Sequence, residues 1–148
     1  MTIKLMHHLF DPWRELSEYV RREPELARCA GAQCVFVGTM REMNQGAQVA
    51  HMMLEYYPGM TERELEKITQ EARERWAVLE SLIVHRVGEI TPGEPIVLVA
   101  VWAVHRGDAF DACRYLMEVL KTRAPFWKKE TLTSQEARWV IENSRGYA

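Results

Sequence analysis

The segment from Ile96 to Val104 constrains the fold of this 148-residue chain most, because all nine of its residues are apolar. A strand with one face in water alternates apolar and polar residues, whereas an unbroken apolar run indicates a strand that is buried on both faces. We therefore expect this segment to be the central strand of a sheet. The segment from Leu82 to Val87 is predicted to be a strand too, because the intervening Pro92-Gly93 is typical of a turn.

Two more segments, Ala32–Met40 and Val49–Tyr57, are rich in strand-forming residues. The polar connection between them contains Gly46, which suits a turn. We expect the two segments to form a long antiparallel pair. Because helical patterns alternate with these strands, we predict an α+β protein with a mostly antiparallel sheet and packed helices.

Two helices are predicted in the first half of the chain. Asp11 as N-cap and Pro12 as first helical residue start one of them, and Pro24 ends it. Thr61 and Glu64 have the spacing of a capping box and predict the start of the other. The charged residues of this second helix fall mostly away from its apolar face, so we interpret them as a solvated surface.

Two more helices are predicted in the second half. We expect Asp108 to be the N-cap of one helix, and Pro125 must end it. Thr133 and Glu136 again have capping-box spacing and predict a short last helix. A mobile tail over about residues 143–148 is expected to follow.

Between these two helices, we expect Phe126 to Thr131 to form a strand. The reason is that Pro125 biases the residue before it toward extended geometry, which leads the chain out of the helix. The alternation of a strand places Lys128 and Glu130 on one face and Lys129 on the other. Lys128 and Lys129 should therefore not share a pocket.

Composition limits the classes of function. The formal net charge of -2 gives no general attraction to nucleic acid or to an anionic membrane, and no segment reaches the roughly 20 apolar residues of a membrane span. Cys29, Cys34 and Cys113 are odd in number and lack CxxC spacing, which indicates free, mostly buried thiols and no metal site. Motifs for nucleotide hydrolysis and dinucleotide binding are missing. We expect a cytoplasmic protein with one domain over residues 1–148.

Cations gather around the helix that Pro125 ends. His105 and Arg106 stand at its start, and Lys121 lies in its last turn. A structural interpretation is available, because a cation in the last turn interacts favourably with the helix dipole. The alternative is an anion site, to which Arg41 would add a planar fork suited to phosphate. The residue pattern alone leaves both interpretations open.

Lys121 and Lys128 also allow a catalytic interpretation. A lysine in apolar surroundings has a lowered pKa, which makes a neutral amine or a proton donor available. Lys128 is a better partner for Lys121 than Lys129 is, because it shares a strand face with apolar neighbours. His85 and Arg86 point to opposite faces of a strand, and we interpret both as structural.

Motifs that run from about residue 30 to 130 point to a family. In chain order they are Phe36–Arg41, Asn44–Gly46, Leu54–Thr61, Arg75–Trp76, His85–Glu89, Pro92–Gly93, His105–Arg106 and Leu120–Glu130. Their order and spacing resemble the MoaE family, the large catalytic subunits of molybdopterin synthase. The resemblance implies an α/β hammerhead-type fold.

The resemblance implies an activity and partners as well. Members of this family are sulfurtransferases that convert cyclic pyranopterin monophosphate (precursor Z) into molybdopterin by installing the two sulfurs of a dithiolene, without a redox cofactor. The sulfur arrives as the thiocarboxylate at the C-terminal Gly-Gly of a small ubiquitin-like subunit. Two large subunits form a homodimer within a heterotetramer. The alternative from another class is a non-catalytic module that only grips the partner's tail.

Site residues follow from the same resemblance. It implies that Lys121 and Lys128 are catalytic. It also implies a substrate-binding set made of Thr39, Met40, Arg41, His105, Arg106, Lys129 and Glu130. Thr39 is a departure, because relatives can carry a basic residue there, and one phosphate contact is then supplied differently. Any contribution from a longer C-terminal tail is in doubt as well, because the chain ends at Ala148.

Overall fold

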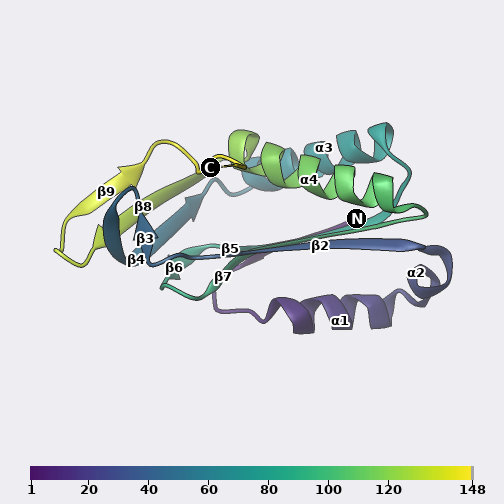
Figure 1. Cartoon of the computed structure of the whole chain (residues 1–148), viewed down its shortest axis with the longest axis horizontal. Helices are drawn as coiled ribbons and strands as arrows, with labels where there is room; N and C mark the ends of the chain where they lie inside the picture. Colours follow the sequence, from purple (N-terminus) through teal and green to yellow (C-terminus); the bar gives the residue numbers. More distant parts are fainter. Residues whose placement is uncertain (148) are drawn as a thin grey trace.

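The computed structural model describes residues 1–147, and its strands form two sheets (Figure 1). The first sheet consists, in spatial order, of β1 (Thr2–Met6), β5 (Val78–Arg86), β7 (Pro95–Ala103) and β2 (Ala32–Thr39). β1 and β5 are parallel, whereas the other two neighbouring pairs are antiparallel. The prediction of a buried central strand is confirmed, because β7 lies between β5 and β2 and is buried from Val97 to Ala103.

Helices cover both faces of this first sheet. They are α1 (Pro12–Arg22), α2 (Pro24–Cys29), α3 (Met60–Arg75) and α4 (Arg106–Arg123). α1 and α2 lie on one face, and α3 and α4 lie on the other (Figure 1). The two faces alternate along β7, since Leu98 packs with Tyr19 of α1 whereas Val99 packs with Leu116 of α4. No helix within residues 1–147 is long and apolar enough to cross a membrane.

The second sheet forms an arm beside the first. Its spatial order is β3 (Met43–Asn44), β4 (Ala47–Tyr56), β8 (Phe126–Leu132) and β9 (Ala137–Val140), and β6 (Gly88–Ile90) also pairs with β4. The inner face of this sheet contributes Met52 and Leu54 to an apolar cluster with Ile90. Most strand pairs in the two sheets are antiparallel, so the predicted α+β class is confirmed.

The predicted pairing of Ala32–Met40 with Val49–Tyr57 is wrong. β2 pairs with β7, whereas β4 pairs with β3, β6 and β8, so the two segments belong to different sheets. The connection between them instead forms a tight hairpin of β3 and β4, in which Gln45 and Gly46 have positive φ angles. Apolar content indicated that both strands are buried, but it did not reveal the partner of either.

The predicted last helix is also wrong. Ala137–Val140 form β9, which pairs antiparallel with β8. The segment that was expected to cap a helix is the hairpin turn, where Gln135 has a φ angle of 68°. A helix this short is unstable on its own, whereas the open edge of β8 offers a complete hydrogen-bond ladder. The predicted mobility of residues 143–148 stays a prediction, and Ala148 lies outside the described residues.

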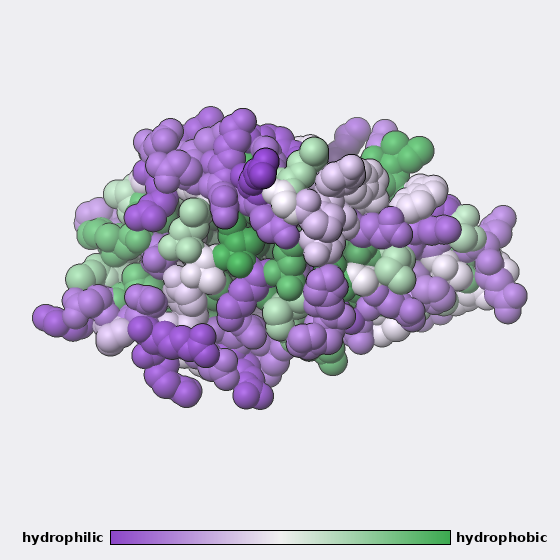
Figure 2. Space-filling model, turned by 180° about the vertical axis from the view of Figure 1, so that it is seen from behind, coloured by the Kyte–Doolittle hydropathy of each residue, from purple (hydrophilic) through white to green (hydrophobic). Residues whose placement is uncertain are grey.

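The helix starts agree in part with the sequence. The side chain of Asp11 accepts hydrogen bonds from two backbone N–H groups of α1, so this predicted start is confirmed. α3 instead has Gly59 as its N-cap, and the N–H of Gly59 donates to Glu62 at 2.6 Å, so the capping box based on Thr61 was placed two residues too late. α4 begins at Arg106, which leaves Asp108 in the first turn. The surface over α3 is mainly hydrophilic, as expected for its charged residues (Figure 2).

Candidate functional site

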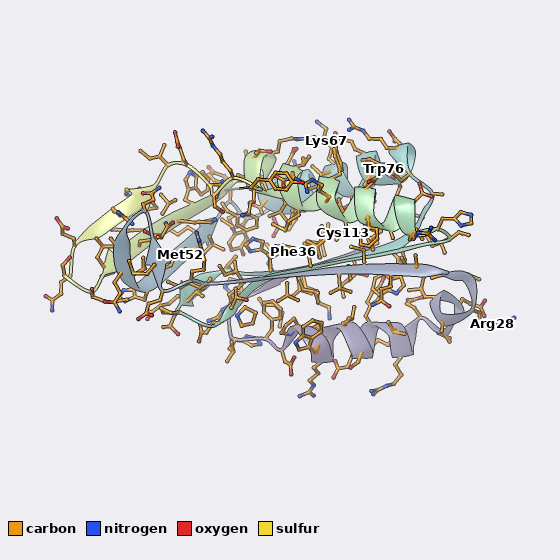
Figure 3. All side chains as sticks on the ribbon, in the orientation of Figure 1. Arg28, Phe36, Met52, Lys67, Trp76 and Cys113 are labelled. Atoms are coloured by element: carbon orange, nitrogen blue, oxygen red, sulfur yellow. The ribbon has the colours of Figure 1, made fainter. Side chains whose placement is uncertain are left out.

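One pocket lies where the two sheets meet, beside the C-terminal end of α4. Its volume is about 170 Å³, and Phe36 of β2 and Met52 of β4 line it from different sheets (Figure 3). Six of the nine expected site residues line this pocket, namely Thr39, Met40, Arg41, Lys121, Lys128 and Glu130. The other three, His105, Arg106 and Lys129, are not among its lining residues.

The two lysines reach the pocket from different elements. Lys121 projects from the last turn of α4, and Lys128 from the third position of β8. Burial lowers the pKa of Lys128, the positive charge of Lys121 lowers it further, and Glu130 opposes the shift. Lys128 therefore gives up its proton more readily than a solvated lysine does.

A buried hydroxyl fixes the strand that carries Lys128. Thr61 of α3 accepts a hydrogen bond from the backbone N–H of Tyr57 at 3.0 Å and donates one to the carbonyl of Pro125 at 3.1 Å. Pro125 is the second of the two residues between the end of α4 and the start of β8. Thr61 thus ties the start of α3 to the turn that brings the second lysine back toward the first.

The C-terminal segment covers the lysines. The ammonium group of Lys121 donates to Ser144 Oγ at 3.0 Å, and that of Lys128 donates to Asn143 Oδ1 at 2.9 Å. The side-chain amide of Asn143 also donates to the backbone carbonyl of Lys121 at 2.6 Å. An extended peptide segment therefore already places one oxygen acceptor on each lysine.

Glu130 is a buried carboxylate with both oxygens engaged. It is 4% exposed, and it accepts from the amide of Asn44 at 2.6 Å and from Nε of Arg138 at 3.0 Å. Arg138 also donates to the backbone carbonyl of Asn44 at 2.8 Å. These bonds join β3, β8 and β9 at the pocket wall. Arg138 was missed from the sequence, because it lies in the segment that was predicted to be helical.

His85 is a second residue that the sequence analysis did not place in the site. It lines the pocket, is 4% exposed, and stacks on Phe126 with ring centroids 4.0 Å apart. Its Nδ1 lies 2.8 Å from the carbonyl of Arg86. Burial, with a smaller contribution from the charge of Lys128, lowers its pKa to about 4. Alternation did predict opposite faces for His85 and Arg86, but not which face would border a pocket.

Three expected site residues lie elsewhere in the chain. His105 and Arg106 are exposed at the start of α4. At a rise of 1.5 Å per residue, the helix separates Arg106 from Lys121 by about 22 Å. Lys129 points to the outer face of β8, where its ammonium lies 5.5 Å from the ring centre of Trp139. One chain therefore brings Arg41 together with the two lysines, but not with His105 or Arg106.

The cysteines are free thiols, as predicted. Cys113 is buried, Cys34 is half-buried and Cys29 is exposed. Burial is the main cause that raises the pKa of Cys113, so this thiol is unreactive at neutral pH. Cys113 lies between α4 and the sheet, near the pocket residue Phe36 (Figure 3). No group of three or more potential metal ligands occurs within residues 1–147.

The chemistry of the pocket is that of an anion site. Lys121, Lys128 and Arg41 supply three cations; of the two lining carboxylates, Glu130 is neutralised by Arg138, and Glu142 offsets one cation at most. Ammonium groups in a site with little water stabilise negative charge far better than they do in bulk water. The arrangement therefore suits a reaction in which charge develops on oxygen or sulfur.

Comparison with known proteins agrees with this fold. The family model described as "MoaE protein" matches residues 7–123. A molybdopterin synthase catalytic subunit from Pseudomonas aeruginosa is 47% identical over 140 residues, which cover 95% of this chain and 90% of that protein. A second, from Ralstonia nicotianae, is 46% identical and covers 94% of this chain and 76% of its own length.

Solved structures show the same likeness. The molybdopterin biosynthesis MoaE protein from Burkholderia ambifaria superposes with a TM-score of 0.76 at 48% identity, covering 94% of this chain and 88% of that one. Molybdopterin synthase from Staphylococcus aureus gives a TM-score of 0.80 at 30% identity, covering 94% and 96%. Fold and site thus define an α+β protein with a lysine-lined pocket. The chain belongs to the MoaE protein family.

Proposed function

We propose that this chain is the sulfur-transferring catalytic subunit of a molybdopterin synthase. Its substrate is cyclic pyranopterin monophosphate, its sulfur donor is the C-terminal thiocarboxylate of a small ubiquitin-like partner, and its product carries the dithiolene of molybdopterin. One observation carries the proposal: Lys121 and Lys128 share a pocket in which each donates a hydrogen bond to an oxygen of an extended peptide segment. The terminal thiocarboxylate and backbone carbonyls of a partner's tail can take the place of these side-chain oxygens. The reaction takes place in the cytoplasm, in keeping with three free thiols.

The two lysines have a shared task in this reaction. The thiocarboxylate sulfur attacks a carbon of the pterin side chain, and negative charge moves onto the departing oxygen. Two ammonium groups in a partly dry pocket stabilise that charge. The lowered pKa of Lys128 helps it to donate a proton to the leaving oxygen. Water then releases the acyl group of the partner as a carboxylate.

The phosphate of the substrate needs binding residues other than the two lysines. Arg41 lines the pocket and offers a bidentate fork. His105 and Arg106 lie at the far end of α4, so in this proposal they reach the pocket of a second copy of the chain. The functional unit is then a homodimer, with one small subunit at each end of a heterotetramer. An inactive Arg106→Ala chain mixed with an inactive Lys128→Ala chain should regain activity, because one site in the mixed dimer is intact.

The alternative is a binding module that grips the partner's tail without chemistry. Lys121→Ala and Lys128→Ala distinguish the two functions. If the chain is an enzyme, each variant lowers molybdopterin formation by about 100-fold or more, because general acid catalysis alone contributes that much. Affinity for the partner stays within about threefold of the wild type. A module would lose affinity and have no turnover to lose.

Lys67→Ala is the matched control for these variants. It removes the same charge from an exposed residue of α3 that does not line the pocket. Turnover close to that of the wild type is expected. Full turnover in both Lys121→Ala and Lys128→Ala, measured with precursor and thiocarboxylated partner, contradicts the catalytic assignment.

A further inference from the structure

The position of His85 suits contact with a bound ligand as well as core packing. It is the next to last residue of β5, and its side chain faces the pocket while that of Arg86 turns to the opposite face. The ring of Phe126 stacks on it at an interplanar angle of 12°. Because both residues sit in strands of different sheets, the stack fixes the imidazole plane at the junction between those sheets.

The hydrogen bond of Nδ1 determines the tautomer. Nδ1 lies 2.8 Å from the backbone carbonyl of Arg86, and a carbonyl oxygen can only accept. Nδ1 therefore carries the proton and donates it, which leaves Nε2 with a free lone pair. Burial keeps the ring neutral at physiological pH, since it lowers the pKa of His85 to about 4.

Both lysines and Glu130 of the pocket already have hydrogen-bond partners within the chain. Asn44 and Arg138 occupy the two oxygens of Glu130, and residues 143–144 occupy the ammonium groups of both lysines. Nε2 of His85 makes no hydrogen bond to any residue in the described range 1–147. Because His85 lines the pocket, the lone pair of Nε2 is available to a hydrogen-bond donor of a bound ligand.

The position of residues 143–144 in the pocket indicates which ligand donates a hydrogen bond to Nε2 of His85. Asn143 and Ser144 satisfy Lys128 and Lys121 but leave His85 free. A tail bound to the lysines in this way does not reach Nε2, whereas the second substrate of the reaction has to lie beside the tail. A pterin ring carries several N–H groups in its plane, and the lysines and Arg41 can donate but cannot accept from them.

We propose that His85 Nε2 accepts a hydrogen bond from a ring or amino N–H group of the bound pterin and so selects and orients that substrate. The inference rests on the proposed function and adds a substrate-contacting residue to it. It places a neutral acceptor with a fixed ring plane beside the cations of the pocket, which favours a pterin over a plain phosphate ester.

Three substitutions separate this role from a structural one. His85→Phe keeps the ring and the stack on Phe126 but removes both nitrogens. His85→Asn keeps a donor near the position of Nδ1 and loses the acceptor at Nε2. His85→Gln restores an acceptor close to the position of Nε2. His85→Asn and His85→Gln form a pair that tests the acceptor at Nε2 even if His85→Phe fails to fold.

The measurement is equilibrium binding of cyclic pyranopterin monophosphate to each intact variant, without the partner, so that sulfur transfer is not needed. His85→Phe and His85→Asn should weaken binding about tenfold, which is the cost of one lost hydrogen bond to a buried donor. His85→Gln should stay within about threefold of the wild type. A peptide that ends in Gly-Gly, titrated as a second probe, should bind all four proteins alike.

Two results overturn the inference. One is wild-type affinity for the pterin in both His85→Phe and His85→Asn. The other is an equal loss of peptide affinity, which assigns Nε2 to the partner's tail instead. Failure of the proposed function is distinguishable from both, because the wild-type protein would then fail to bind the pterin or to convert it with the thiocarboxylated partner.

Discussion

The two sheets differ in what covers them. The first is enclosed by α1 and α2 on one face and by α3 and α4 on the other, and Leu98 and Val99 of β7 are both 0% exposed. The second has an apolar inner face, but its outer face presents Trp127 at 44% and Trp139 at 52% exposure. The difference concerns packing and charge: the enclosed sheet supplies most of the packing energy, whereas the open arm supplies Lys128 and Glu130 to the pocket.

This comparison explains where the charged groups are. Glu130, Lys128 and Arg138 all come from β8 and β9 of the arm, where a carboxylate and two cations can be paired at a partly wet wall. A buried charge in the enclosed sheet is costlier and, within residues 1–147, occurs only at its rim, where Arg86, the last residue of β5, donates to the carbonyl of Glu89 at 2.8 Å and lies 3.7 Å from Glu94. Substitutions in the two sheets should therefore change different measured quantities.

The largest effect on stability is expected in the enclosed sheet. Leu98→Ala should lower the free energy of unfolding by about 4 kcal/mol, since it opens a cavity in a wholly buried strand. Trp139→Ala on the open arm should cost less than about 1 kcal/mol, although it removes a larger side chain. Urea unfolding measures both. Similar losses for the two variants would contradict the division between the sheets.

The second-largest effect is a pH dependence of the free energy of unfolding, which arises from His85 at the junction between the sheets. The unfolded chain binds a proton at His85 near pH 6.5 and the folded chain near pH 4, so the contribution of His85 is complete above pH 6.5 and is lost as the pH falls toward 4. The loss amounts to about 3 kcal/mol. Urea unfolding of the wild type and His85→Phe at pH 7.5 and 4.5 measures it, because the variant lacks this part of the pH dependence. Parallel pH profiles would show that His85 binds its proton equally well in the folded and the unfolded chain, so that burial does not lower its pKa.

A moderate effect is expected in the arm. Arg138→Ala leaves the buried carboxylate of Glu130 with one donor and should lower the free energy of unfolding by about 2 kcal/mol, because hydrogen bonds to a charged group are stronger than neutral ones. Arg138→Lys keeps the charge but cannot reach Glu130 and the carbonyl of Asn44 together, so it should recover about half of the loss. Chemical denaturation measures both variants. An unchanged free energy of unfolding in both variants would mean that water makes the hydrogen bonds of the missing guanidinium.

The smallest effect on stability belongs to the tail. Deletion of residues 142–148 removes the hydrogen bonds of Asn143 and Ser144 and should change the free energy of unfolding by less than about 1 kcal/mol, because these residues are exposed. The same deletion frees both lysines. Binding of a peptide that ends in Gly-Gly, measured by titration, should therefore become tighter. Weaker binding would mean that the tail helps to build the peptide site.

Local patterns predicted the elements of the first sheet well. The nine apolar residues from Ile96 indicated a central strand, and Asp11 with Pro12 located α1, because these signals depend only on neighbours in the chain. The short elements β1 and α2 carry too few residues for a periodic signal and were not predicted. The strand pairing could not be predicted, because β2 pairs with β7 and β4 pairs with β8 across about 60 to 80 positions of the chain.

The arm was harder to predict. Thr133 and Glu136 fit a capping box, and a hairpin turn tolerates the same residues, so only the edge of β8 decides between helix and strand. Alternation correctly put Lys128 and Glu130 on one face of β8. It could not place His85 in the pocket, because the stack on Phe126 joins residues of two sheets. The roles that the family resemblance implies stay predictions for all nine site residues, including the six that line the pocket.

The parallel pair of β1 and β5 has a consequence for biosynthesis. Thr2 lies beside Leu82 in the sheet, so the first strand leaves the ribosome about 80 residues before its partner does. Translation adds roughly 5 to 20 residues per second, so β1 lacks its neighbouring strand for about 4 to 16 s. A chaperone that binds the nascent N-terminus, or a fusion placed there, acts in that interval. Completion of the enclosed sheet is therefore timed by translation.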